Sequence, residues 1–280
     1  MRKIAILLFA IVFGFKGFAQ DDVNESKNFR LGLHFDPYIN WYNPVDQRRF
    51  ENGGTKLKFS IGAVTDFKLG GNVWLSTGIG FSFLGGAYNF LEDNNNSLQN
   101  DTYGYFLHDN EIIDFDELDP ANLTSAYSAD TAFIGVTGRN IRARYLTLPL
   151  LLKIKTKEIG YLTYFGQFGA INHIKMGSVK TDDTGNDLTS SNSPDLTQLL
   201  IDNEPSLFQV AANIGFGVEY NISGSTSLYG SLQLNYGLNS ALKRESEHIV
   251  RWNAAAGQFE RYDDKKINMH SIVLSIGVLF

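Results

Sequence analysis

Apolar residues recur at every second position through about eight segments of this chain, and this period of two limits the folds open to it. In the segment NFRLGLHFDPYINWY, the odd positions carry Phe29, Leu31, Leu33, Phe35, Pro37, Ile39 and Trp41. The even positions include Arg30, Gly32, His34, Asp36 and Asn40. Successive side chains of a β-strand point to opposite faces of the sheet, so this alternation predicts a strand with one apolar face.

The same alternation recurs in the segments 55–69, 72–84, 208–219, 228–239 and 271–280. Two middle segments, 141–155 and 159–176, are less regular, and the orientation of their faces stays open. Together these segments predict about eight strands. Most of them are longer than the five or six residues that are usual in soluble sheets.

The links between the segments alternate between short and long. The short ones are LGGN, TKEIG and NISGS, and the long, polar ones are roughly 43–54, 86–139, 178–205 and 240–266. An even strand number with this alternation is typical of outer-membrane barrels. A soluble lipocalin-like barrel is the alternative, but it turns its apolar faces inward around a ligand. We therefore predict an all-β fold, an eight-stranded antiparallel transmembrane β-barrel over 29–280 with short periplasmic turns and long extracellular loops.

The first twenty residues, MRKIAILLFAIVFGFKGFAQ, have the pattern of a secretory signal peptide, with a basic start followed by an apolar run from Ile4 to Phe15. We expect a signal peptide over 1–19 and a periplasmic segment over 20–28. Removal of Arg2, Lys3 and Lys16 leaves 21 basic residues against 30 acidic ones, a net charge of −9. This balance argues against nucleic acid as a partner. The chain contains no Cys, which excludes disulfides and Cys nucleophiles.

The polar faces of the predicted strands supply a candidate set of lumen residues. The interior of an eight-stranded barrel is filled by side chains, and buried charges need partners there. We expect a polar network of Arg30, His34, Asp36, Lys56, Lys58, Asp66 and Glu219, with Lys68, Arg142 and Arg144 as further candidates. A structural filling of the lumen is the favoured interpretation, and a proton or ion path is the alternative.

The segment 86–139 is the most unusual of the predicted loops. No Lys or Arg occurs between Lys68 and Arg139, whereas Asp, Glu and Asn are frequent. Oxygen ligands at this density suit Ca²⁺, but the D-x-[DN]-x-[DN]-G loop is missing, so we predict a solvated loop with no metal and no cofactor. The apolar interruptions YGYFL and EIIDF indicate packing on the chain itself or on a partner.

Catalytic motifs are scarce. The sequence HDNE at 108–111 lies in a predicted extracellular loop, where membrane-barrel enzymes place His and Asp beside Ser. No Ser motif accompanies it, no G-x-S-x-G occurs, and the five His belong to no acid–base constellation. We predict a protein that is not an enzyme, and loss of a hydrolase or acyltransferase activity on substitution of His108 would contradict this.

Several stretches resemble the PorT-like outer-membrane β-barrel family of Bacteroidota. They are GFAQ, FRLGLHFDPYINWYNP, RYLTLPLLLKIK, FGQFGAI, ANIGFGVEYNIS and SIGVLF. The resemblance covers most of 20–280 except the loops and implies an outer-membrane location. For PorT itself it implies a part in type IX protein secretion and gliding. The ending Ile276, Val278 and Phe280 is similar to the C-terminal signal that outer-membrane barrels present to the barrel assembly machinery.

These observations predict an accessory or interaction protein that acts through its extracellular loops. The alternative is a PorT-like component of type IX secretion, and a narrow channel, a transporter or a membrane-barrel enzyme is less favoured. The expected partners are outer-membrane lipids, the barrel assembly machinery and secretion-system or envelope proteins. The oligomeric state stays open.

Overall fold

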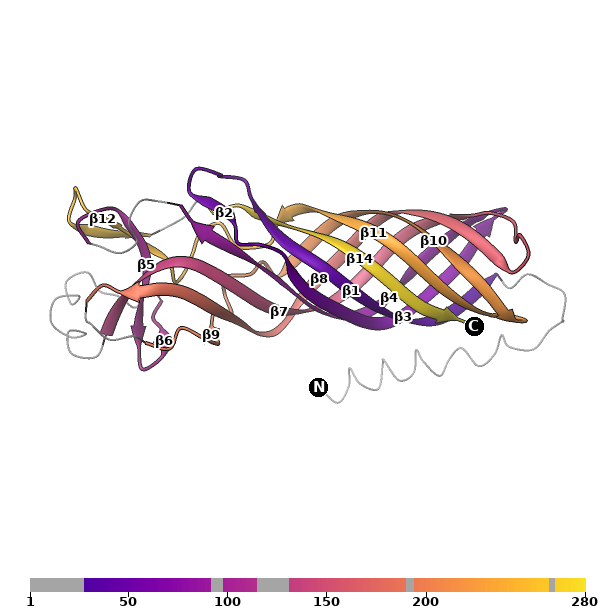
Figure 1. Ribbon diagram of the computed structural model, residues 1–280, viewed down its shortest axis with the longest axis horizontal. Coiled ribbons are helices and arrows are strands. Elements are labelled where there is room, and N and C mark those ends of the chain that lie inside the picture. Colours follow the sequence, from indigo (N-terminus) through magenta and orange to yellow (C-terminus); the bar gives the residue numbers. More distant parts are fainter. Residues whose placement is uncertain (1–27, 92–97, 115–130, 190–193, 262–264) are drawn as a thin grey trace.

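Eight long antiparallel strands close into a barrel, as the sequence predicts. The computed structural model describes residues 28–91, 98–114, 131–189, 194–261 and 265–280, so the predicted signal peptide lies outside the described residues. The barrel strands are β1 (Phe29–Pro44), β3 (Lys56–Gly70), β4 (Val73–Phe90), β7 (Thr131–Lys155), β8 (Leu162–Asp187), β10 (Phe208–Ser223), β11 (Thr226–Ser240) and β14 (Ile267–Leu279). They are ordered β7-β4-β3-β1-β14-β11-β10-β8, and pairing of β8 with β7 closes the ring (Figure 1).

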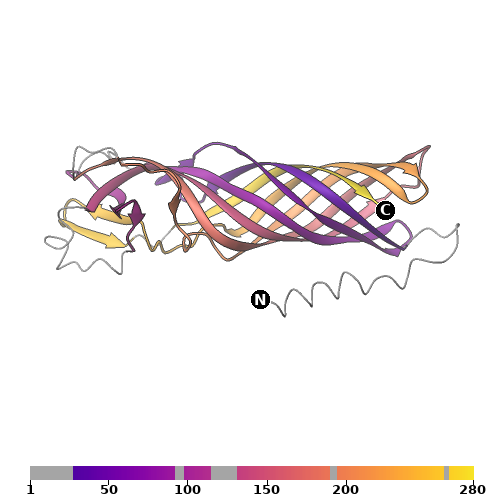
Figure 2. The ribbon, with the colours of Figure 1, turned by 90° about the horizontal axis from the view of Figure 1, so that it is seen from below.

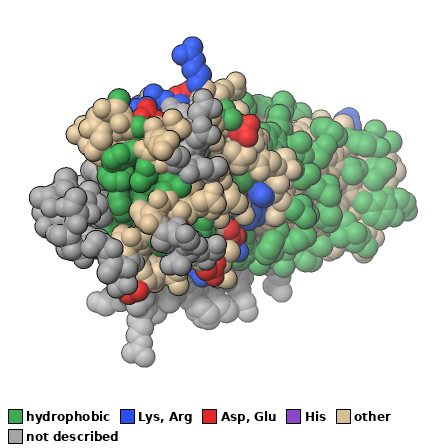
Figure 3. Space-filling model, turned by 60° about the vertical axis from the view of Figure 1, so that its left-hand side comes forward, with side chains coloured by type: hydrophobic (Ala, Val, Ile, Leu, Met, Phe, Trp, Pro, Cys, Tyr) green, Lys and Arg blue, Asp and Glu red, His purple; other side chains and the backbone are tan. Residues whose placement is uncertain are grey.

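The outward-facing residues of these strands form an apolar band around the wall. On β1 the exposed residues are Phe29, Leu31, Leu33, Phe35 and Ile39. The eleven residues from Phe29 to Ile39 match the 9–11 residues with which a tilted strand crosses the hydrocarbon of a bilayer. Figure 3 shows this part of the surface covered by hydrophobic side chains, whereas the other end of the molecule is mixed and polar. No helix in the described part of the chain is long and apolar enough to cross a membrane.

The structure settles the faces of the two irregular strands. On β7, Tyr145, Thr147, Leu151 and Lys153 are buried, whereas Leu150 and other even positions face outward. In the irregular part of β8, up to residue 176, the buried residues are Phe165, Gln167, Ile171 and His173. The apolar run from Leu146 to Leu152 hides this orientation in the sequence, because both faces of the strand carry Leu there.

Short and long connections lie at opposite ends of the barrel. The short links around Gly71, 156–161 and Gly224 share one end with the C-terminal residue, and both glycines adopt positive φ there (51° and 56°). Since short turns are periplasmic in outer-membrane barrels, the opposite end is extracellular. At that end β7 and β8, with 25 and 26 residues, run far beyond the barrel (Figure 2).

The segments that we expected to be long polar loops contain additional strands. These are β2 (Phe50–Asn52), β5 (Thr102–His108), β6 (Glu111–Ile112), β9 (Leu199–Leu200), β12 (Val250–Asn253) and β13 (Gln258–Arg261). They widen the protruding parts of β4, β7 and β8 into one sheet, with β12 and β13 reaching β7 through β5. We call this protruding part the extracellular extension. Its apolar residues pack on the protein itself, which is why the loop prediction underestimates its order.

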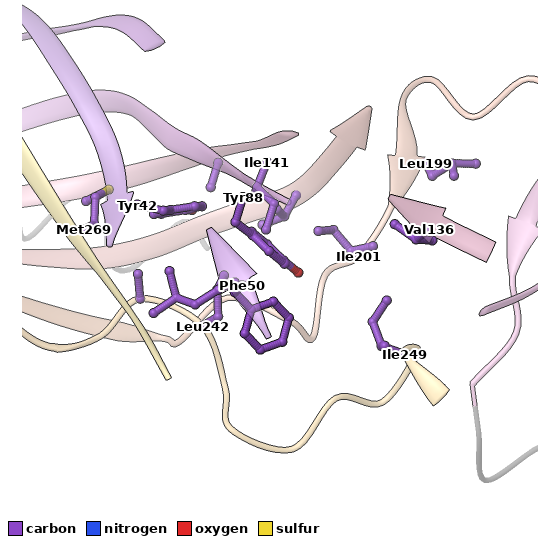
Figure 4. Close-up of a cluster of buried hydrophobic side chains, with 14 of the residues drawn as sticks. Tyr42, Phe50, Tyr88, Val136, Ile141, Leu199, Ile201, Leu242, Ile249 and Met269 are labelled. Carbon is purple, nitrogen blue, oxygen red and sulfur yellow. The ribbon is translucent and has the colours of Figure 1, made fainter. Parts of the chain in front are cut away.

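The largest buried hydrophobic cluster lies where the barrel meets the extension. It includes Tyr38, Tyr42 and Tyr145 from the barrel strands and Tyr88, Ile134 and Ile249 from the extension. Figure 4 shows these strands and loops converging on it. The extracellular end of the barrel is therefore filled by apolar side chains.

Candidate functional site

Five charged side chains form a chain of contacts across the lumen near the periplasmic end. Arg30 Nη1 lies 2.7 Å from Glu219 Oε2, and Lys155 Nζ lies 2.6 Å from Glu219 Oε1. Lys155 also donates to Asp66 at 3.2 Å, and Lys153 contacts both Asp66 oxygens at 3.1 Å. The charges alternate in sign along this chain, so each carboxylate lies between two cations. We call these five residues the charged layer.

The charged layer joins three of the predicted lumen residues to two that were not predicted. Arg30, Asp66 and Glu219 are predicted residues, whereas Lys153 and Lys155 were hidden by the apolar surroundings in LPLLLKIK. Lys153 and Lys155 are two residues apart and lie an even number of residues from Tyr145 and Thr147. This spacing puts all four on the same face of the strand, and it was the one indication in the sequence that the lysines face the lumen. Aromatic rings cover the lysines: Lys155 lies 4.5 Å from the Trp74 ring centroid.

His34 and Asp36 form a separate contact higher in the lumen. His34 Nδ1 lies 2.7 Å from Asp36 Oδ2, and the Ser275 hydroxyl donates to Asp36 Oδ1 at 2.5 Å. Around them lies a layer of neutral polar groups, in which Ser82, Thr147 and His173 are linked at 2.6 and 2.8 Å. This middle layer encloses a cavity of about 60 Å³, which has room for a few water molecules.

Lys56 and Lys58 do not belong to this network, contrary to the prediction. In the described part of the chain neither lysine forms an ion pair, and Lys58 lines a groove on the outer wall with Arg142 and Arg144. Arg142 and Arg144 face outward from β7, because they alternate with the buried residues Ala143 and Tyr145. The prediction assumed that the polar positions of these strands face the lumen, although β3 separates from β4 beyond Phe59 and the faces of 141–155 were open.

The extracellular end of the lumen is closed by an aromatic plug made of Tyr38, Tyr42, Phe50, Tyr88 and Tyr145. All five are buried, with at most 4% of their surface exposed. The ring centroids of Tyr42 and Tyr88 lie 6.4 Å apart, and those of Phe50 and Tyr88 lie 5.8 Å apart. Gln209 Nε2 donates to the Tyr145 hydroxyl at 2.7 Å, which satisfies a polar group inside the plug.

The extension contains two buried ion pairs of its own. Arg139 on β7 donates through Nε and Nη2 to Asp183 on β8, at 3.0 and 2.7 Å, and both side chains are fully buried. The Glu204 carboxylate accepts hydrogen bonds from Lys265 and from the Ser246 hydroxyl. Burial alone would raise the pKa of Glu204, but the charges of Lys265 and Arg139 and these hydrogen bonds lower it to about 2. The first pair links the two long strands β7 and β8, and the second links the connection before β10 to the connection before β14.

The HDNE sequence forms a hairpin turn between β5 and β6. His108 pairs with Glu111, and the two central residues Asp109 and Asn110 have φ of 48° and 64°. Positive φ at both central residues is the signature of a type I′ turn, for which Asn and Asp are favoured. The geometry of the turn therefore explains why Asp109 and Asn110 occur at these two positions. Within the described ranges, no group of three or more His, Asp or Glu residues is placed to hold a metal ion.

The predicted assembly residues lie on the outer wall. Ile276 and Phe280 are half exposed, Val278 shares their face, and the Phe280 N–H donates to the Leu31 carbonyl at 2.7 Å. Residues 276–278 pair with β1 on one side and β11 on the other. Their role in assembly stays a prediction.

A closed ring of eight strands, an apolar outer band and a polar lumen together define an outer-membrane β-barrel. Residues 18–243 match the family described as outer membrane protein beta-barrel domain, and the chain belongs to that family. Fold and family place it in an outer membrane. This match identifies the outer-membrane barrel family and does not assign the chain to the PorT-like proteins or to Bacteroidota.

Solved structures of similar fold include several bacterial outer-membrane proteins. OprG from Pseudomonas aeruginosa is 8% identical with a TM-score of 0.40, over 93% of this chain and 99% of its own. Neisserial surface protein A is 8% identical with a TM-score of 0.39, over 91% and 98%. A major outer membrane protein from Thermus thermophilus is 12% identical with a TM-score of 0.39, over 91% and 99%. No curated protein sequence matches significantly. Likenesses of this degree carry no functional inference.

Proposed function

We propose that this protein is a non-enzymatic accessory or interaction protein of the outer membrane that presents its extracellular extension to partners. The observation that carries the proposal is the buried cluster that fills the barrel mouth and continues into the extension. Loops without a core bury little apolar surface and change conformation easily. Strands that share a core hold the residues on their outer surface in one arrangement. A preformed surface binds at a lower ordering cost than mobile loops do.

The lumen supports this proposal over a channel or transporter. Charged layer, middle layer and aromatic plug follow one another from the periplasmic to the extracellular end. An eight-stranded barrel has an interior just wide enough for side chains, and here side chains fill it at each level except for a cavity of about 60 Å³ in the middle layer.

The surroundings of HDNE support a role without catalysis. His108 and Asp109 lie in a hairpin turn, and the side chain of Asp109 is almost fully exposed. A catalytic base needs a partner and a place for substrate next to it. The positive φ of Asp109 and Asn110 in this turn accounts for the residue types there without a catalytic role.

Site-specific photo-crosslinking in cells tests the interaction role. We would place a photo-crosslinking amino acid at Leu98, Leu200 or Gln258 in the extension, and at Phe216 or Leu232 on the lipid-facing wall as matched controls. The expected result is a discrete protein adduct from at least one extension position and none from the controls. Absence of such an adduct from all three extension positions, with the protein correctly inserted, would contradict the proposal.

The sequence resemblance suggests secretion-system proteins as one class of partner. Loss of type IX secretion and gliding on deletion of the gene, restored by the intact chain, would support that assignment. We further infer that residues 1–19 are removed on export, and N-terminal sequencing of membrane-extracted protein should then begin near residue 20.

A further inference from the structure

A groove opens in the outer wall at the extracellular end of the lipid-facing band. The pairing of β3 with β4 begins at Phe59 and Phe83, whereas β4 continues along β7 up to the pair of Asn89 and Gly138. Residues 56–58 of β3 therefore lie beside β1 but not beside β4. The resulting groove has a volume of about 530 Å³, and it lies between Leu57–Phe59 on one side and 142–144 on the other.

Four of the ten residues that line this groove are basic. They are Lys58, Arg142, Arg144 and Lys180. Arg142 pairs with Asp182 at 2.5 Å, whereas Lys180 and Arg144 contact only the neutral groups of Gln198 at 3.2 Å and Ser178 at 3.5 Å among the described residues. Within the same part of the chain, Asp182 is thus the one carboxylate paired with these four cations. The groove carries a net positive charge that its own walls do not balance.

The other lining residues place the groove at the level of lipid headgroups. Leu57, Phe59 and Phe83 line it and are exposed, Leu57 by 78%. Arg144 lies on the same outward face of β7 as Leu146, Leu148 and Leu150, which continue toward the membrane centre. Basic side chains directly above such apolar residues stand where the hydrocarbon of the outer leaflet ends.

We propose that this groove binds the phosphorylated headgroup of an outer-leaflet glycolipid. Phosphate oxygens would contact Lys58, Arg144 and Lys180, and acyl chains would lie on Leu57, Phe59 and Phe83. Arginine suits this role because its planar guanidinium donates two parallel hydrogen bonds to a phosphate. A free anion would gain nothing from the apolar side of the groove, whereas a lipid uses both sides. This site is independent of any protein partner of the extension.

Native mass spectrometry of the full chain in detergent micelles tests the site, with diphosphoryl lipid A as the probe. Each basic residue near a membrane surface contributes about 1 kcal/mol, which corresponds to about fivefold in affinity. Arg144→Gln and Lys180→Gln should each weaken binding by about this factor, and Lys58→Gln/Arg144→Gln/Lys180→Gln should abolish it. Asp182→Asn, which removes the one carboxylate and keeps a hydrogen-bond acceptor, should strengthen binding.

Two controls distinguish lipid binding in the groove from a general effect of charge and from capture of a free anion. Arg48→Gln and Lys157→Gln neutralise exposed cations away from the groove and should leave binding unchanged, and heat-modifiable gel mobility verifies that each variant is folded. Monophosphoryl lipid A should bind more weakly, and inorganic phosphate at the same concentration should not compete. Equal binding of diphosphoryl lipid A to wild type and the triple variant would overturn the proposal. Full competition by inorganic phosphate would also overturn it, because it would indicate an anion site only.

Discussion

Asp66 shows how a single side chain supports several others in the lumen. Its carboxylate is fully buried and contacts the ammonium groups of Lys153 and Lys155, while Lys155 also contacts Glu219. Removing one partner of a buried ion pair lowers the stability of the folded state by more than the intact pair contributes to it, because the remaining charge is buried without an opposite charge. Among the described residues, Asp66 is therefore the one carboxylate paired with Lys153 and one of two paired with Lys155.

Asp66→Asn should destabilise the barrel by about 3–5 kcal/mol, since Lys153 loses its only carboxylate among the described residues. Urea unfolding in detergent, followed by tryptophan fluorescence, measures the effect. Glu51→Gln is the matched control, because Glu51 is exposed and lies in the extension. Asp66→Asn/Lys153→Met should recover part of the loss, and a double variant as unstable as the single one would contradict this role of Asp66.

Glu204 gives the extension a defined pH dependence. Its folded-state pKa of about 2 lies below the unfolded value of about 4.3, so its ionisation stabilises the folded state above pH 4.3. This contribution is lost as the pH falls from about 4.3 toward 2. We expect hydrogen exchange of 240–250, corrected for the intrinsic rate, to accelerate across this window. Glu204→Gln should exchange faster at neutral pH and change less on acidification, and an identical pH profile would contradict the assignment.

At the scale of elements, the period of two clearly predicts six of the eight barrel strands, and the segments 141–155 and 159–176 were predicted as strands without an orientation of their faces. It worked because lipid on one side and a narrow lumen on the other impose strict alternation on β1, β10 or β14. It failed for β5, where TYGYFL is buried on both faces within the extension. Neither face of β5 meets solvent or lipid, so its two faces do not differ in polarity. The sequence therefore does not distinguish such a strand from a loop that packs on a partner.

The prediction of lumen residues depends on the same contrast between an apolar and a polar face of each strand. Arg30, Asp66 and Glu219 come from cleanly alternating strands and lie in the charged layer, whereas Lys153 and Lys155 of the same layer were overlooked. Lys58 was assigned inside although it lines the outer groove, because the divergence of β3 from β4 depends on pairing that spans the fold. Alternation predicts the face of a residue only where the strand remains part of the closed wall.

The protruding parts of β7 and β8 should fold on the barrel but not determine its insertion. Ile134 is fully buried in the extension and pairs with Tyr105 of β5. Ile134→Asp places an unpaired charge in that core and should make the extension sensitive to trypsin, while the barrel keeps its heat-modifiable mobility. Thr137→Asp, at a partly exposed position of the same strand, should leave the extension resistant. Loss of the folded barrel in Ile134→Asp would show that the two parts are one unit.

At the scale of the whole molecule, three different kinds of filling lie in series. The charged layer occupies the periplasmic end, neutral polar groups the middle, and the aromatic plug the extracellular end. The plug shares its residues with the core of the extension, so the same side chains that block the lumen also hold the extracellular surface in place. A closed lumen and a rigid outer surface are thus two consequences of one core.

Because the three layers lie in series, opening one of them should not create a pore. Wild-type protein in a planar bilayer should show no steady conductance, and Tyr42→Ala/Tyr88→Ala should remain silent because the charged and middle layers still fill the lumen. The same variant should nevertheless expose the extension to trypsin, since it removes two rings from the shared core. A porin in the same bilayer is the positive control, and heat-modifiable mobility verifies the folded barrel. Steady conductance from the wild type would reject the closed lumen, and conductance from the variant would mean that the plug alone seals it.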